Sequence, residues 1–153
     1  MKIIDLLKTD YILEALKSDT KRDVLLELMA PFLKHYPKLD PEIALSVLME
    51  REKLGSTGIG EGIAIPHGKL AGLDDLVVCF GKSAAGIDFN AMDGKPVYLF
   101  FLLLAPENSV GQHLKTLAKI SRMLKDSRFR TRLIEAKSRD EIFEMIAQQD
   151  DGI

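Results

Sequence analysis

The sequence predicts an α/β protein, a three-layer α/β/α arrangement in which a mixed β-sheet is flanked by helices. Two apolar runs, residues 76–80 and 97–104, are continuous rather than alternating, which is typical of strands covered on both faces. Residues 86–89 are expected to add an edge segment. The chain has 153 residues, 46% hydrophobic and 29% charged, an ordinary composition for one globular domain. We therefore expect a single domain over residues 1–153.

The N-terminal third of the chain predicts a short strand and two helices. The strand is expected around residues 11–15. Thr20 precedes an apolar stripe with helical spacing, so a helix should begin there and end near residues 35–37. Asp40 is a suitable N-cap for a second helix, which should run to about Lys53. The residues expected to face the core are Val24, Leu25, Leu28, Met29 and Phe32 in the first helix and Ile43, Leu45, Val47, Leu48 and Leu54 in the second.

The C-terminal part predicts three helices. Ser109 and Gln112 have the spacing of a capping box, so a helix should cover residues 110–124. Two more helices are expected, one over residues 127–136 and one that begins at a second box starting with Ser138. The inner face of the 110–124 helix is expected to consist of Leu114, Leu117, Ala118, Ser121 and Leu124.

A glycine-rich stretch, GSTGIGEGIAIPHGK at residues 55–69, separates the second helix from the buried strands. Connections of this length without a regular period are usually functional, and we expect a loop at one end of the sheet. Pro66 fixes its own φ and pushes Ile65 toward extended geometry, so the chain that leads into His67 has little freedom and the imidazole is held as a nucleophile would be. The plain alternative is a surface turn that happens to contain a histidine. The loop residues expected to bind phosphate are Ser56, Thr57, Gly58, Gly60 and Gly68.

Two further residues are candidates for the same site. Arg51 lies four residues before Gly55, and a guanidinium can grip phosphoryl oxygens with two hydrogen bonds. His113 falls in the first turn of the 110–124 helix, where free amides and the helix dipole favour an anion. For His113 the commoner explanation is a histidine buried in the core, and for Arg51 it is a solvated cation at a helix end. The functional reading requires both to converge on His67.

Composition excludes several classes of function. The net charge of −2 argues against a partner that is nucleic acid, because phosphate-tracking surfaces carry a basic excess. The single cysteine, Cys79, excludes an internal disulfide, and no metal-ligand spacing or cofactor motif is present. The glycines at 58, 60 and 62 lack the strand and helix that a dinucleotide fingerprint needs. We expect no signal peptide, no membrane insertion and a cytoplasmic protein.

The run from Glu52 to Gly68 resembles the phosphohistidine signature of a known family. An acidic residue, six residues, Ile59-Gly60, two residues and Ile63-Ala64-Ile65-Pro66-His67-Gly68 match the fructose and mannitol-type IIA domains of the bacterial phosphotransferase system. The resemblance extends to GIDFNAMDGKPV, FLLLAPEN and HLKTLAKISRML, which look most like the nitrogen-regulatory branch.

The resemblance implies a fold, a reaction and partners. The fold would be a mixed sheet between helices, and Nε2 of His67 would accept a phosphoryl group from the phosphohistidine of a carrier protein, HPr or its nitrogen-branch homologue. His113 would contact the phosphoryl group and Arg51 would neutralise it, without metal or cofactor. Regulatory target proteins or a IIB domain would lie downstream.

Three functions remain open from the sequence. The first is a phosphoryl carrier that regulates nitrogen or potassium metabolism. The second is a sugar-specific IIA component that passes phosphate to the cysteine of a fructose or mannitol-type IIB domain. The third is a binding module without covalent chemistry.

Overall fold

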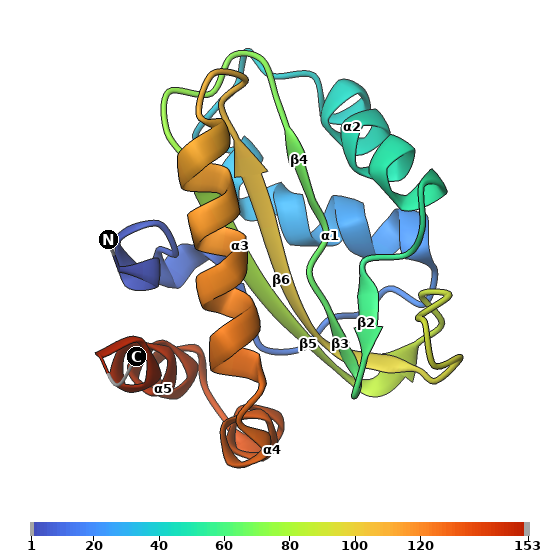
Figure 1. Cartoon of the computed structure of the whole chain (residues 1–153), viewed down its shortest axis with the longest axis vertical. Coiled ribbons are helices and arrows are strands. Elements are labelled where there is room, and N and C mark those ends of the chain that lie inside the picture. The colour runs from blue at the N-terminus through green and yellow to red at the C-terminus, as the bar shows by residue number, and fades with distance from the viewer. Residues whose placement is uncertain (1, 152–153) are drawn as a thin grey trace.

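The computed structural model describes residues 2–151, which form a sheet with helices on both of its faces (Figure 1). Two short 3-10 helices, η1 (Ile3–Asp5) and η2 (Thr9–Tyr11), precede the first strand. The strands are β1 (Ile12–Leu13), β2 (Gly58–Gly60), β3 (Ile63–Ala64), β4 (His67–Lys69), β5 (Val77–Ile87) and β6 (Val97–Ala105). The helices are α1 (Lys21–Leu33), α2 (Pro41–Lys53), α3 (Val110–Leu124), α4 (Ser127–Glu135) and α5 (Arg139–Asp151).

The sheet is mixed, as predicted. Its strands follow the order β1-β5-β6-β3-β2, and β4 pairs with β6 beyond the end of β3. β5 and β6 are antiparallel, whereas β1 pairs with β5, and β3 and β4 pair with β6, in parallel. In β6 only Tyr98 is partly exposed. This burial on both faces explains the unbroken apolar sequence of that strand.

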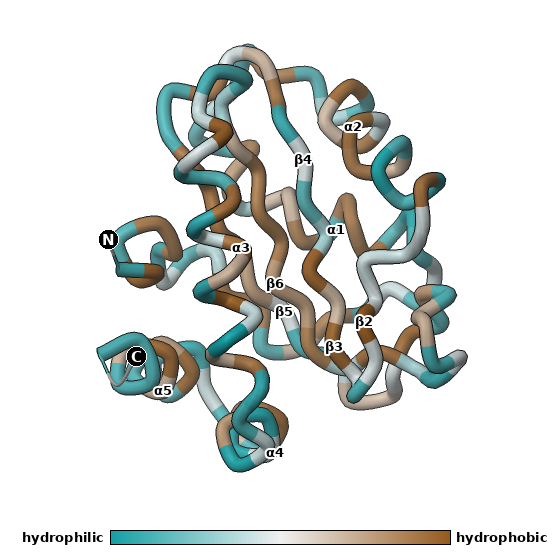
Figure 2. The backbone as a smooth tube through the Cα atoms, viewed as in Figure 1, coloured by the Kyte–Doolittle hydropathy of each residue, from teal (hydrophilic) through white to brown (hydrophobic). Residues whose placement is uncertain are grey.

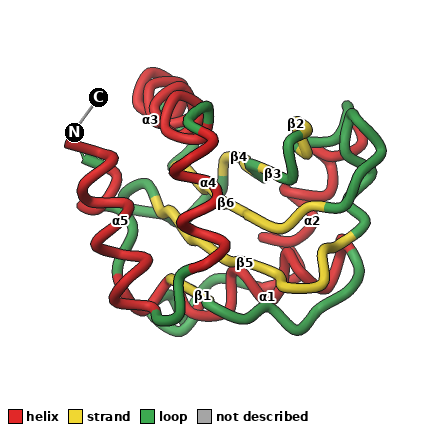
Figure 3. The backbone as a smooth tube through the Cα atoms, turned by 90° about the horizontal axis from the view of Figure 1, so that it is seen from below, coloured by secondary structure: helices red, strands yellow, loops and turns green. Residues whose placement is uncertain are grey.

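Helices cover the two faces of the sheet, which confirms the three-layer prediction. Contacts place α1 and α2 on β5 and β4, and α3 and α4 on β6. Figure 3 shows α3, α4 and α5 on one side of the strands and α1 and α2 on the other. The hydrophobic stretches of the tube in Figure 2 run through β5 and β6, between the two layers of helices. The core therefore has two halves, divided by the central strands.

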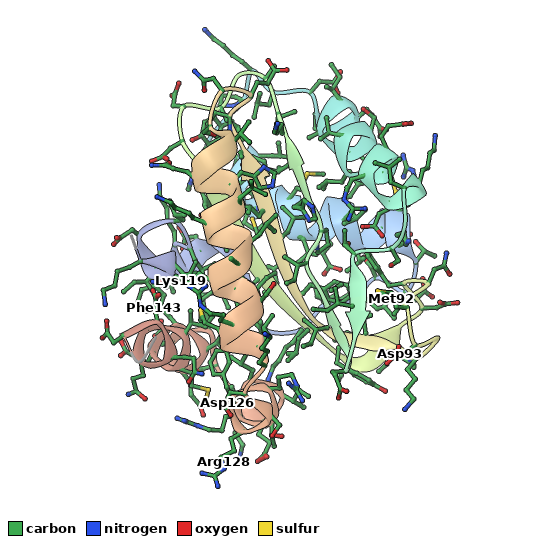
Figure 4. The ribbon with its side chains drawn as sticks, in the orientation of Figure 1. Met92, Asp93, Lys119, Asp126, Arg128 and Phe143 are labelled. Atoms are coloured by element: carbon green, nitrogen blue, oxygen red, sulfur yellow. The ribbon has the colours of Figure 1, made fainter. Side chains whose placement is uncertain are left out.

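The glycine-rich stretch is not the end loop that the sequence suggested. It contributes β2, β3 and β4, which run along one edge of the sheet. The turn between β2 and β3 has positive φ at Gly60, Glu61 and Gly62. Asp93, which Figure 4 labels in the connection between β5 and β6, accepts a hydrogen bond from the backbone N–H of Glu61. Pairing with β6 is long-range, so no local period in the sequence revealed it.

Most predicted helix boundaries are confirmed, with local differences. Thr20 and Asp40 cap α1 and α2 through their side chains, but α1 ends at Leu33, before the predicted residues 35–37. Ser138 caps α5 as expected. The capping box at Ser109 is wrong, because its hydroxyl donates to the carbonyl of Pro106 instead.

Two predicted helix faces also differ from the structure. In α2, Ile43 and Leu54 are exposed. In α3, Leu114 and Ala118 are exposed, and Leu117 and Ser121 are only partly buried. The buried residues of α3 are His113, Thr116, Ile120, Met123 and Leu124. Of the predicted inner face only Leu124 is among them, although these five residues have the 3-4 spacing of one helical stripe. The strand predicted at residues 76–80 extends to Ile87 in the structure, so the predicted edge segment at residues 86–89 partly belongs to β5.

Candidate functional site

His67 is the first residue of β4, next to β6 (Figure 1). Its Nδ1 lies 2.8 Å from the carbonyl oxygen of Ile65, and a carbonyl can only accept a hydrogen bond. Nδ1 therefore carries the proton in the neutral ring, and Nε2 keeps a free electron pair. The side chain is half-buried, so the ring is not sealed in the core. The backbone thus fixes both the tautomer and the orientation of the imidazole.

Arg51 reaches His67 from the last turn of α2. Its Nε donates to Nε2 of His67 at 3.3 Å, and its Nη1 donates to the carbonyl of Gly55 at 2.8 Å. The close packing of α2 on β4 makes this reach possible. A Cβ at Gly68 would lie only 2.6 Å from Cγ1 of Val47 in α2, so only glycine fits there.

His113 reaches the same place from the first turn of α3. Its ring meets that of His67 edge to face, with centroids 5.5 Å apart and planes 82° apart. His113 is 7% exposed, and its buried Nε2 has no hydrogen-bond partner in the structure. A buried polar atom without a partner is costly and calls for an explanation, of which a catalytic role is one. The structure therefore brings His67, Arg51 and His113 together, as the sequence suggested.

The surroundings of both imidazoles favour the neutral form. Burial lowers the pKa of His67, and the nearby positive charge of Arg51 adds to this effect. The hydrogen bond to Ile65 and the negative charge of Glu52 act in the opposite direction on the same pKa. Burial also lowers the pKa of His113, followed by the charges of His67 and Lys69. A neutral His67 has the electron pair that a nucleophile needs.

The residues expected to bind phosphate make other contacts in the structure. The hydroxyl of Ser56 donates to the carbonyl of Phe89 and accepts from the N–H of Gly58. The N–H and hydroxyl of Thr57 both donate to Glu52. Their role in phosphate binding stays a prediction.

The glycines of the same set also lie in strands. Gly58 pairs with Ala64, which in turn pairs with Phe100 of β6. His67 pairs with Leu103, three residues further along β6. Three residues of strand correspond to about 10 Å, so Gly58 lies well along the strand direction from the imidazole. Gly60 shares β2 with Gly58. Of the predicted set, only Gly68 directly adjoins His67.

Sequence reasoning missed a buried pair next to this site. Glu52, which the sequence marks only as the acidic residue of the signature, is 8% exposed and accepts hydrogen bonds from Thr57 and Lys21. Lys21 comes from the start of α1, 31 residues earlier in the chain. No local signal in the sequence joins the two.

Other candidates are structural. Cys79 is fully buried in β5, and burial raises the pKa of its thiol, in keeping with the predicted inert core residue. His35 is exposed, and its Nδ1 lies 2.8 Å from the hydroxyl of Tyr11. Within residues 2–151, no three His, Cys, Asp or Glu side chains gather as a metal site would require. None of the helices in this range is both long and apolar enough to cross a bilayer.

Comparison with known proteins gives one consistent family. Residues 5–149 match the family described as phosphoenolpyruvate-dependent sugar phosphotransferase system, EIIA 2. A nitrogen regulatory protein of Bradyrhizobium diazoefficiens is 42% identical over 147 residues, which cover 96% of this chain and 95% of that protein. The fructose-specific EIIABC component of Bacillus subtilis is 37% identical over 150 residues, 98% of this chain but only 24% of that protein. The crystal structure of the nitrogen regulatory protein IIA-Ntr from Neisseria meningitidis is 34% identical, with a TM-score of 0.87 over 94% of this chain and 98% of that chain.

Proposed function

Because the chain belongs to the EIIA 2 family of the phosphoenolpyruvate-dependent sugar phosphotransferase system, we propose that His67 is the residue on which it carries the phosphoryl group. The observation that supports this most is the orientation of the imidazole. Ile65 holds the proton on Nδ1, so Nε2 presents its electron pair between Arg51 and His113. Nε2 is therefore the proposed attachment point.

The transfer takes place between two imidazole rings. The electron pair of Nε2 attacks phosphorus while the bond from phosphorus to the donor ring breaks, and the electrons of that bond stay with the donor nitrogen. No base has to remove a proton from His67 first, because the attacking nitrogen carries none. Positive charge that develops on the ring is stabilised by the hydrogen bond from Nδ1 to the carbonyl of Ile65.

Arg51 and His113 stabilise the phosphoryl oxygens. Arg51 exchanges its hydrogen bond with Nε2 for bonds to the incoming oxygens, to which a guanidinium fork is well matched. His113 uses the Nε2 that has no protein partner, and a protonated Nε2 donates to a phosphoryl oxygen. A loose phosphoryl transition state needs mainly such positioning and positive charge.

The proposed donor is the phosphohistidine of an HPr-like carrier, and the proposed role is regulatory. Support for the role comes from the relatives named nitrogen regulatory protein, which this chain matches over almost their full length. A regulatory protein of this kind would act on target proteins through its phosphorylation state. The site needs no metal for this transfer, since Arg51 supplies the positive charge.

The second candidate function is transfer to a IIB domain in sugar uptake. The match to a fructose-specific EIIABC component supports it. The two functions differ in the acceptor: a sugar-specific chain would pass its phosphoryl group rapidly to a fructose or mannitol-type IIB cysteine. We expect slow or absent transfer to such a IIB domain and retention of the phosphoryl group on this chain.

The experiment that tests the function is phosphorylation from phosphoenolpyruvate through enzyme I and an HPr-like carrier. We expect one acid-labile, alkali-stable phosphate per chain, absent from the His67→Ala variant. The matched control is His35→Ala, which removes an exposed histidine far from the site along the chain. If the wild-type chain took up no phosphate from a competent donor, it would be a binding module instead.

A further inference from the structure

A buried ion pair includes Glu52, the residue that follows Arg51 in α2. Nζ of Lys21, at the start of α1, lies 3.0 Å from Oε1 of Glu52 in the last turn of α2, and the two side chains are 16% and 3% exposed. Nζ of Lys21 also lies 4.6 Å from the centre of the buried Phe89 ring. Charges so far from water are expensive unless each is matched. The arrangement therefore needs an explanation beyond chance pairing on a surface.

The position of Lys21 opposes an ordinary preference of helices. Lys21 is the first residue of α1, directly after the N-cap Thr20. The N-terminus of a helix carries partial positive charge, so a cation is disfavoured in the first turn. Lys21 turns away from this end and pairs with a carboxylate on another helix. Stabilisation of its own helix does not account for it.

Glu52 connects this pair to the backbone that holds Arg51. Both oxygens of Glu52 accept from the N–H of Thr57, at 3.2 and 3.3 Å, and one accepts from the Thr57 hydroxyl. These hydrogen bonds hold the turn between the end of α2 and the start of β2 in a closed loop. The carbonyl of Gly55, which accepts from Nη1 of Arg51, lies inside that closed segment. The geometry of Glu52 and the geometry of Arg51 are therefore coupled.

We propose that Lys21 and Glu52 are positioning residues for phosphoryl transfer: Glu52 fixes the turn that orients Arg51, and Lys21 neutralises Glu52 so that its carboxylate does not draw Arg51 away from His67. The inference rests on the proposed function of His67. Arg51 and Glu52 both act electrostatically on the His67 ring, so they lie in the same neighbourhood, and a carboxylate that has lost its cation attracts a nearby guanidinium. Arg51 would then face Glu52 rather than the phosphoryl group.

Changes in the pair should alter the titration of His67. The charged groups that act on His67 are Arg51 and Glu52 on α2, its ring contacts His113 on α3, and Lys69 on β4 acts on His113. Arg51 lowers the pKa of His67 and Glu52 raises it. Loss of Lys21 would expose the full charge of Glu52 and remove Arg51 from the ring. Both effects raise the pKa of His67.

The test compares Lys21→Met with the double variant Lys21→Met/Glu52→Gln. For each we would measure kcat and KM for phosphoryl uptake from a phosphorylated HPr-like carrier, and the pKa of His67 by NMR of its ring nitrogens. We expect kcat of Lys21→Met to fall about tenfold or more with KM little changed, because the reacting groups are misplaced while docking is intact. The pKa of His67 should rise. The double variant, which has no unpaired charge, should have a kcat and a His67 pKa close to those of the wild type.

Two more variants separate positioning from a purely structural role. Lys53→Met removes an exposed cation from the end of the same helix, where it pairs with Glu50, and should change neither kcat nor the pKa. Thr57→Val alters no charge but removes a bond to Glu52, so it should lower kcat and raise the pKa of His67 even if Lys21→Met does not fold.

Three results would overturn the inference. The first is wild-type kcat and His67 pKa in both folded Lys21→Met and Thr57→Val. The second is a folded double variant that is as slow as Lys21→Met, since the pair would then be structural. The third is an unchanged pKa when kcat falls. If the wild-type chain accepts no phosphate at all, the proposed function fails, whereas the pKa measurements still decide whether the pair orients Arg51.

Discussion

Nε of Arg51 donates to Nε2 of His67 at 3.3 Å, so the guanidinium occupies the position that a phosphoryl group would take. The same hydrogen bond keeps the electron pair of Nε2 free of a proton and brings a permanent positive charge to the place of reaction. It must break when phosphorus approaches. Arg51 is then already within reach of the phosphoryl oxygens, so little rearrangement is needed.

Replacement of Arg51 should slow phosphoryl uptake without preventing it. We expect Arg51→Ala to lower kcat about 10²-fold, the typical cost of one preorganised donor. The pKa of His67 should rise, because Arg51 lowers it in the wild type. Arg51→Lys should recover only part of the rate, since an ammonium lacks the planar fork. Arg22→Ala, which changes an exposed arginine paired with Glu42, is the control for charge alone; equal rates for both alanine variants would exclude Arg51 from the site.

Replacement of His113 should affect function and stability in opposite directions. His113→Leu removes a buried nitrogen that has no partner in the unphosphorylated chain. Such an atom costs about 1–3 kcal/mol, so the free energy of unfolding should stay the same or increase. The rate of phosphoryl uptake should fall at least tenfold, by about the cost of one transition-state hydrogen bond. Chemical denaturation and uptake kinetics on the same preparation provide both measurements, and an unchanged rate would leave His113 as a core residue.

Acid should reduce stability through the two site histidines. The pKa values of His67 and His113 both lie below the ordinary 6.5, so the unfolded chain binds protons that the native chain does not. Their contribution to the free energy of unfolding is therefore fully present above pH 6.5 and is lost as pH falls through the folded pKa values. Denaturant titrations at several pH values should show this loss in the wild type and a smaller one in His67→Gln/His113→Gln. A loss of equal size in the two proteins would contradict the prediction.

The contact between Gly68 and Val47 should set the distance between α2 and β4. Gly68→Ala places a methyl group 2.6 Å from Val47, and overpacking of this kind costs about 1–3 kcal/mol. Uptake should slow as well, because α2 carries Arg51. Adding Val47→Ala should restore part of both losses. Gly111→Ala is the matched control: a Cβ there meets nothing within 4 Å, so this helical position should become slightly more stable.

The sequence predicted those parts of the fold that depend on local patterns. Strands β5 and β6 were found because they are continuous apolar runs, and α1 and α2 because Thr20 and Asp40 are strong N-caps. The pairing of β4 with β6 was not found. It joins residues far apart in the chain, and the glycines that allow it look like loop residues in isolation.

The prediction of which face of a helix is buried failed for a different reason. Ile43, Leu54 and Leu114 were assigned to the core because they are apolar, yet all three are exposed. The inner face of α3 instead contains the polar His113 and Thr116. A residue type predicts burial only on average, and the choice between two apolar stripes depends on what packs against the helix. The inner face is harder to identify when it carries a site residue, because that residue is polar at a position where an apolar side chain is expected.

The site itself was predicted in part. His67, Arg51 and His113 converge as expected. Lys21, which is connected to the site through Glu52, did not enter that prediction. A charge pair between two helices leaves no mark at fixed spacing in the sequence. Only the packing of α1 against α2 reveals it.

The most direct test is to identify the phosphorylated atom. The chain, with nitrogen-15 in its histidine rings, would be phosphorylated through an HPr-like carrier and observed by NMR with phosphorus coupling. We predict coupling to Nε2 of His67, with Nδ1 still protonated and bound to Ile65. A phosphoryl group on Nδ1 of His67, or on any other residue, would contradict the account.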